Sequence, residues 1–114
     1  MVTHMVLMKP RPNLSVGERQ AFVAAFEHAL GAIPWIRGVR IGRRVTHGAG
    51  YEHGLPDAAD FLAAIDFDDL AGLQAYLTHP AHDELGARFG HSLSAALVYD
   101  FEVGGVEALR NGLV

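Results

Sequence analysis

The sequence contains no cysteine among its 114 residues. Disulfide bridges, zinc sites built on thiolates and cysteine nucleophiles are therefore excluded. Charge is also sparse, at 19% of residues, and no run of like charges exceeds the group Arg40, Arg43 and Arg44. Because a nucleic-acid partner normally needs a basic stripe, we expect none. No stretch approaches about 18 consecutive apolar residues, so we expect no membrane span and a cytoplasmic location.

Apolar residues are abundant by contrast. They make up half of the chain, and the mean hydropathy is +0.16. A chain of this length forms one compact domain, so we predict a single domain over residues 1–114. The domain proper covers about residues 3–103. Gly104 and Gly105 free the last residues, 104–114, which form either a C-terminal tail or an arm that grips a partner.

The spacing of apolar residues predicts an alternation of strands and helices. Ser15 and Glu18 form a capping-box pattern that starts the first helix, and Asp69 is placed to cap the second. The order β-α-β-β-α-β predicts an α+β, ferredoxin-like fold with an antiparallel sheet and helices on one face. The predicted strands cover 4–8, 39–46, 61–67 and 95–103. The first helix begins at about Val16 and is ended by Gly31 and Pro34, the second covers 70–77, and a short helix 81–89 follows Pro80.

Two of these strands carry apolar residues on both faces. In the strand over 61–67, Leu62 and Ala64 lie opposite the apolar face that contains Ala63 and Ile65. Two helices cover only one face of a sheet, so the other face needs a different cover. A second copy of the same sheet is the simplest cover, and we therefore expect a homodimer.

The segment Asp68 to His82 is the most informative part of the chain. In it, Tyr76 precedes the sequence His-Pro-Ala-His over 79–82. This pattern resembles the signature of the stress-responsive dimeric α/β-barrel (Dabb) family, and the resemblance covers roughly residues 3–103. It implies a ferredoxin-like fold whose two sheets meet face to face as a dimeric α/β barrel. Supporting similarities lie at His4, at Ile33 and Pro34, and at Tyr99, Asp100 and Phe101.

The resemblance also implies candidate site residues. One plant member of the family is a polyketide cyclase that closes an aromatic ring by aldol condensation, using the tyrosine and the second histidine of this pattern. These positions match Tyr76 and His82 here. A histidine on the first strand of that cyclase matches His4, whereas another cavity histidine falls on Phe61, so the match is incomplete.

The spacing of Tyr76 and His82 leaves two interpretations open. Six residues of unbroken helix would place the two side chains about 240° apart around the axis, pointing away from each other. They meet only if Pro80 redirects the chain. In that case neutral His82 is a candidate general base for a carbon acid and Tyr76 its hydrogen-bonding partner. Otherwise Tyr76 is a packing residue and His82 braces the kink.

His79 has two further interpretations. It forms a pair with His82 at the i, i+3 spacing of metal ligands, and Asp83, Glu84 and His91 are the nearest additional donors. Alternatively, the turn before Pro80 holds His79 in place. We expect no metal and no cofactor. The predicted substrate-binding residues are His4, Phe61, Tyr76 and His79.

Three functions are compatible with these residues. The first is a stress-response-like protein that binds a small apolar or aromatic molecule in a cavity between sheet and helices, without established chemistry. The second is a cofactor-free polyketide cyclase or aldolase-like enzyme with His82 as base and Tyr76 as its partner. The third is a cofactor-independent monooxygenase, by analogy of fold alone.

Overall fold

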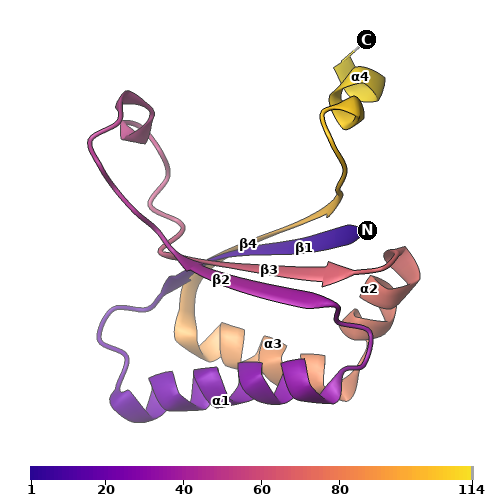
Figure 1. The fold of residues 1–114 in the computed structure, drawn as a ribbon. Helices are drawn as coiled ribbons and strands as arrows, with labels where there is room; N and C mark the ends of the chain where they lie inside the picture. Colours follow the sequence, from indigo (N-terminus) through magenta and orange to yellow (C-terminus); the bar gives the residue numbers. More distant parts are fainter. Residues whose placement is uncertain (114) are drawn as a thin grey trace.

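The computed structural model describes residues 1–113 and consists of one sheet with helices packed on one side (Figure 1). The four strands are antiparallel and lie in the order β2-β3-β1-β4. This order and the β-α-β-β-α-α-β chain path confirm the predicted ferredoxin-like fold. The elements are β1 (Val2–Pro10), α1 (Val16–Ala32), β2 (Gly38–Arg43), the short 3₁₀ helix η1 (Gly50–Glu52), β3 (Phe61–Phe67), α2 (Leu70–Leu77), α3 (Pro80–Ser92), β4 (Leu93–Glu102) and α4 (Glu107–Leu113).

Side chains at the helix starts explain where the helices begin. The Ser15 hydroxyl accepts a hydrogen bond from the Glu18 amide at 3.1 Å, and the Asp69 carboxylate accepts one from the Gly72 amide at 2.9 Å. Each satisfies an amide that has no partner inside its helix. Both predicted helix starts are confirmed.

Several element ends differ from the prediction. α1 continues through Gly31 to Ala32, because the constraint imposed by Pro34 acts on the residue before it, Ile33, which is extended. α3 runs three residues past Phe89 and leads directly into β4. β2 ends at Arg43, so Val45, which was predicted within it, is 77% exposed in the loop. The predicted tail contains a helix, α4.

The core lies between the sheet and the helices. β1 and β3 contribute Val6, Ile65 and Phe67 to the core. α1 contributes Ala29, and Ile33, which directly follows the helix, also lies in the core. All five side chains are almost completely buried. Helices α1 and α3 pack against each other across this layer (Figure 1). No helix within residues 1–113 is long and apolar enough to cross a membrane.

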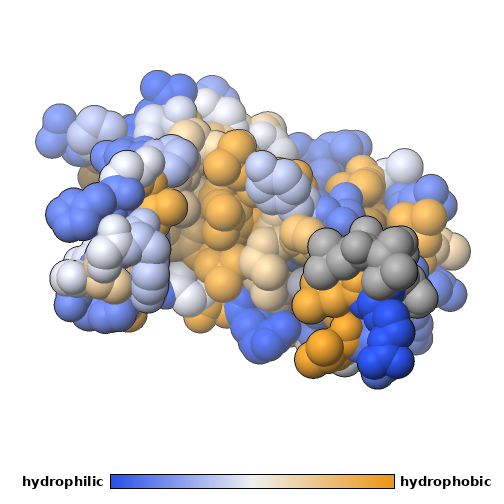
Figure 2. All heavy atoms as spheres, turned by 90° about the horizontal axis from the view of Figure 1, so that it is seen from above, coloured by the Kyte–Doolittle hydropathy of each residue, from blue (hydrophilic) through white to orange (hydrophobic). Residues whose placement is uncertain are grey.

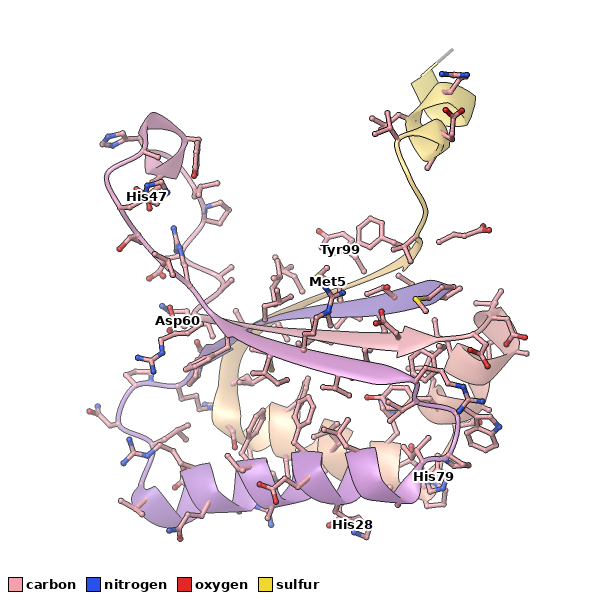
Figure 3. The ribbon with its side chains drawn as sticks, in the orientation of Figure 1. Met5, His28, His47, Asp60, His79 and Tyr99 are labelled. Carbon is pink, nitrogen blue, oxygen red and sulfur yellow. The ribbon has the colours of Figure 1, made fainter. Side chains whose placement is uncertain are left out.

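The other face of the sheet carries no helix (Figure 1). Met5 and Tyr99 point away from the helices on this open face (Figure 3), and apolar side chains gather over it (Figure 2). Tyr99 and Phe101 are 52% and 50% exposed. The structure therefore confirms that the sheet is apolar on both faces and that α1, α2 and α3 cover only one.

Core packing gives a stability prediction. Ile65 is completely buried at the centre of the sheet, whereas Ile41, on the neighbouring strand β2, is 58% exposed. Ile65→Ala should lower the free energy of unfolding by about 2–5 kcal/mol, because it removes buried methyl groups and leaves a cavity. Ile41→Ala is the matched control and should lower it by much less. Urea unfolding of both variants at one protein concentration measures the two free energies. An equal loss of unfolding free energy in Ile65→Ala and Ile41→Ala would contradict the prediction.

Candidate functional site

Pro80 brings Tyr76 and His82 together. α2 ends at Leu77, His79 takes an extended backbone conformation, and Pro80 is the first residue of α3. The new helix therefore starts in a different direction, and the Tyr76 and His82 ring centroids lie 4.7 Å apart with an angle of 64° between the ring planes. Pro80 therefore redirects the chain, which is the condition under which Tyr76 and His82 were expected to meet.

Tyr76 lies at the centre of a group of rings. Its side chain is only 1% exposed, and its ring centroid lies 5.2 Å from that of Phe67 and 5.6 Å from that of His4. Burial raises the pKa of Tyr76 to about 12. The phenol therefore remains protonated across the physiological range and acts as a hydrogen-bond donor. Among the contacts of residues 1–113, its hydroxyl has no hydrogen-bond partner within the chain.

A carboxylate holds the third member of the group. His4 is 4% exposed on β1, and its Nδ1 lies 2.6 Å from Oδ1 of Asp100, the residue opposite it on β4. An ionised carboxylate only accepts hydrogen bonds, so Nδ1 of His4 donates. Asp100 was noted in the sequence as a family similarity and not as a site residue. Pairing the first and last strands antiparallel, with His4 opposite Asp100, would have identified it.

His82 has the opposite protonation preference to Tyr76. Burial lowers the pKa of His82 below its ordinary value of 6.5, and the nearby His4 lowers it further. The Asp83 carboxylate and a hydrogen bond to the Leu77 backbone act in the opposite direction and raise it. The net shift is downward. At neutral pH His82 is therefore an uncharged ring, able to accept a proton, in contact with a phenol that keeps its own.

His79 lies in the turn and supports it. Its Nδ1 accepts a hydrogen bond from the Ala81 amide at 3.0 Å, which caps α3, and its ring lies edge-on to Trp35 with the centroids 6.3 Å apart. This is the arrangement expected if the turn holds the histidine. Within residues 1–113, no three His, Asp or Glu side chains form a group that could hold a metal ion.

Phe61 belongs to a separate hollow in the helix layer. It pairs with Met8 at one end of β1, whereas His4 pairs with Ile65 four residues away, a distance of about 13 Å along the strand. A cavity of about 460 Å³ lies beside Phe61, between α1 and the sheet. Almost all of its lining is apolar, and it includes Met8, Phe22, Val23, Phe26, Leu30, Ile41, Phe61 and Leu93, with Arg19 and Glu27 as its charged members.

The low pKa of His82 can be tested by titration. The Cε1 proton of His82, followed by NMR, should titrate with a midpoint below pH 6.5. Asp83→Asn should lower the midpoint further, because it removes a negative charge that favours the protonated ring. Between pH 6.5 and that midpoint the unfolded chain binds the proton more readily, so the free energy of unfolding should fall as the pH falls. A midpoint above 6.5 would contradict the assignment.

The sequence is similar to one curated enzyme. Olivetolic acid cyclase from Cannabis sativa is 22% identical over 103 residues, which cover 88% of this chain and 94% of that protein.

Two solved structures illustrate the shared fold. A dimeric ferredoxin-like protein of unknown function from Thermobifida fusca matches with a TM-score of 0.68 and 22% identity, covering 90% of each chain. Hydroxynitrile lyase from Passiflora edulis matches with a TM-score of 0.76 and 14% identity, covering 92% of this chain and 94% of that one. The family model of the Stress responsive A/B Barrel Domain matches residues 2–103, and the chain therefore belongs to this family.

Proposed function

We propose that the protein binds a small apolar or aromatic molecule in the cavity between α1 and the sheet. The observation that carries this proposal is the cavity itself, because a volume of about 460 Å³ is within the range of small-molecule sites. Phe22, Phe26 and Phe61 supply aromatic walls. Arg19 and Glu27 are exposed, so charge is confined to the rim. Such a lining favours a ligand that is apolar over most of its length.

Two valines of α1 provide a matched test. Val23 lines the cavity and is 52% exposed, while Val16 is 60% exposed and does not line it. Val23→Trp should fill part of the cavity and weaken binding of the probe 4-butylphenol by tenfold or more, about 1.4 kcal/mol. Val16→Trp should bind it like the wild type. Isothermal titration calorimetry measures both, and equal affinities would place the probe elsewhere.

A second candidate function is cofactor-free proton-transfer catalysis at Tyr76 and His82. The observation that favours it is the contact between a protonated phenol and a neutral imidazole, each with its pKa moved toward that role. The names of the similar cyclase and lyase are compatible with this class of chemistry. Because the cyclase is only 22% identical, the likeness is support for the proposal and not its basis.

The proposed reaction has two steps. In the first, a ring nitrogen of His82 takes a proton from a carbon next to a carbonyl, while the Tyr76 hydroxyl donates a hydrogen bond to the carbonyl oxygen that becomes an enolate. In the second, the enolate carbon attacks another carbonyl carbon of the same molecule. A carbon–carbon bond forms, and the new alkoxide takes the proton back from His82. No oxidant or reductant is needed.

His4 and Asp100 support this arrangement from β1 and β4. The Asp100 carboxylate accepts a hydrogen bond from the Nδ1–H of His4 and so fixes the orientation of a ring that touches Tyr76. We propose that His4 binds substrate through its other nitrogen, alongside Tyr76. His79 contributes indirectly, because it caps the helix that carries His82.

Exchange of carbon-bound hydrogen tests the catalytic proposal. In D₂O the protein should accelerate deuterium uptake next to the carbonyl of 4-phenyl-2-butanone, as followed by NMR. His82→Ala and Tyr76→Phe should each reduce the acceleration by about 10²-fold or more. His28→Ala is the control, because His28 is an exposed histidine of α1 distant from the site (Figure 3). Full activity of folded His82→Ala would exclude His82 as the base. Uptake of oxygen by the protein with an electron-rich phenol, measured separately, would instead support a monooxygenase.

We also propose that the protein is a homodimer joined through the open face of the sheet. Its apolar residues are half-exposed in one chain, and similar structures are described as dimeric ferredoxin-like proteins. Native mass spectrometry should give a mass of twice 12.3 kDa. Tyr99→Glu should convert this species to monomer, because it places a charge in an apolar interface. Val16→Glu on α1 should remain dimeric, and a monomeric wild type would refute the assembly.

A further inference from the structure

Two segments stand off the open face at opposite ends of the sheet (Figure 1). One is the loop over 44–60 that joins β2 to β3, and the other is α4, which follows β4. Val106, just before α4, is 80% exposed, and Leu109 within α4 is 57% exposed. An ion pair between Glu107 and Arg110 at 3.3 Å lies within the helix itself. Among the side chains described over residues 1–110, none covers these two apolar residues.

A hollow of about 400 Å³ lies between the 44–60 loop and the open face, and we call it the loop groove. Leu7, Leu62 and Leu97 line it from the sheet, and Leu55 and Pro56 from the loop. The base of the loop is tied down, because the Lys9 ammonium donates a hydrogen bond to the Asp57 carboxylate at 2.8 Å. This bond fixes the loop relative to the sheet, and the groove between them is lined by apolar residues.

The groove also carries positive charge. Arg43 and Arg44 are among its lining residues, and both are exposed. Within residues 1–113, neither arginine forms a salt bridge. An apolar segment that also brings a carboxylate would match this surface. Val106 and α4 form such a segment, because Glu107 lies between Val106 and Leu109. The ion pair that Glu107 forms within α4 is exposed to solvent, so it is weak enough for Glu107 to exchange partners.

The structure holds α4 away from the groove of its own chain, at the opposite end of the sheet (Figure 1). Along β4, Leu97 in the groove and Val103, the residue after the strand, are six residues apart, about 20 Å. The three residues from Val103 to Val106 span at most about 11 Å when fully extended, and α4 rises only about 1.5 Å per residue while it stays helical. Folding back along its own strand would therefore bring Leu109 at most to the near edge of the groove, at Leu97. An α4 that comes from another chain meets no such limit.

We infer that the loop groove holds α4 of a second copy, with Val106 and Leu109 on its apolar lining and Glu107 near Arg43 and Arg44. The inference rests on the homodimer proposed above. When two open faces meet, the two-fold axis lies between the sheets. An axis across the strands carries each α4 to the end of the partner's sheet where the 44–60 loop stands. Each chain then fills the groove of the other, and both contacts are identical.

A two-fold axis parallel to the strands gives a different assembly, and the cysteine variants described below distinguish the two. In that case the two α4 helices would meet each other and the two loops would meet each other. The match between a protruding apolar helix and an apolar groove favours the first assembly. Two protruding helices would leave both grooves empty.

Engineered disulfides test the inference without background, because the wild-type chain has no cysteine. The variants are Leu55→Cys, Leu109→Cys and the combination of both, oxidised under dilute conditions and analysed by non-reducing electrophoresis. The double variant should form a covalent dimer, and neither single variant should. Val23→Cys with Leu109→Cys is the control for random collision, because Val23 lies on α1, on the helix-covered side of the sheet. It should remain uncrosslinked.

Every other outcome overturns the inference in a distinguishable way. Crosslinking of Leu109→Cys alone would show that the α4 helices meet each other. An internally crosslinked monomer of the double variant would show that the helix unwinds and returns to its own groove. A wild type that is dimeric by native mass spectrometry, with no crosslink in the double variant, would refute the groove contact alone. A monomeric wild type would refute the dimer and the contact together.

Discussion

Proline cannot continue a helix that precedes it, and at position 80 this constraint determines the candidate site. The pyrrolidine ring forces His79 into an extended conformation and then begins a new helix. An unbroken helix through this segment would point Tyr76 and His82 in different directions. The short turn instead places their rings in contact, and the buried phenol reaches His4 and Phe67 from the same position.

Burial acts on the two central groups in opposite senses, and this separates their roles. A phenol loses its proton to become charged, whereas an imidazole gains one to become charged. A poorly solvated environment disfavours both charged forms. It therefore keeps the proton on Tyr76 and off His82. One donor and one acceptor arise side by side from the same cause, and no charged residue inside the group is needed to create them.

Local patterns predicted much of the fold, because caps and strand alternation depend on neighbours in the sequence. Ser15, Asp69 and the apolar strand over 61–67 were identified in this way. The contact between Tyr76 and His82 was predicted only as a condition, since spacing cannot give the angle between two helices. Asp100 was missed as a site residue because its partner lies 96 residues away on another strand. α4 was not predicted, because two glycines precede it and, within the described residues 1–113, it packs extensively against no other element that would require an apolar face.

The cavity and the reactive rings lie at the two ends of one strand, and packed side chains separate them. Met8 borders the cavity and His4 touches Tyr76, about 13 Å apart along β1. Val6 and Ala63 lie between these ends and are almost completely buried. A molecule that extends from the cavity to the rings would therefore have to displace the core. One face of a single strand thus carries two sites that are kept apart by the packing that stabilises the fold.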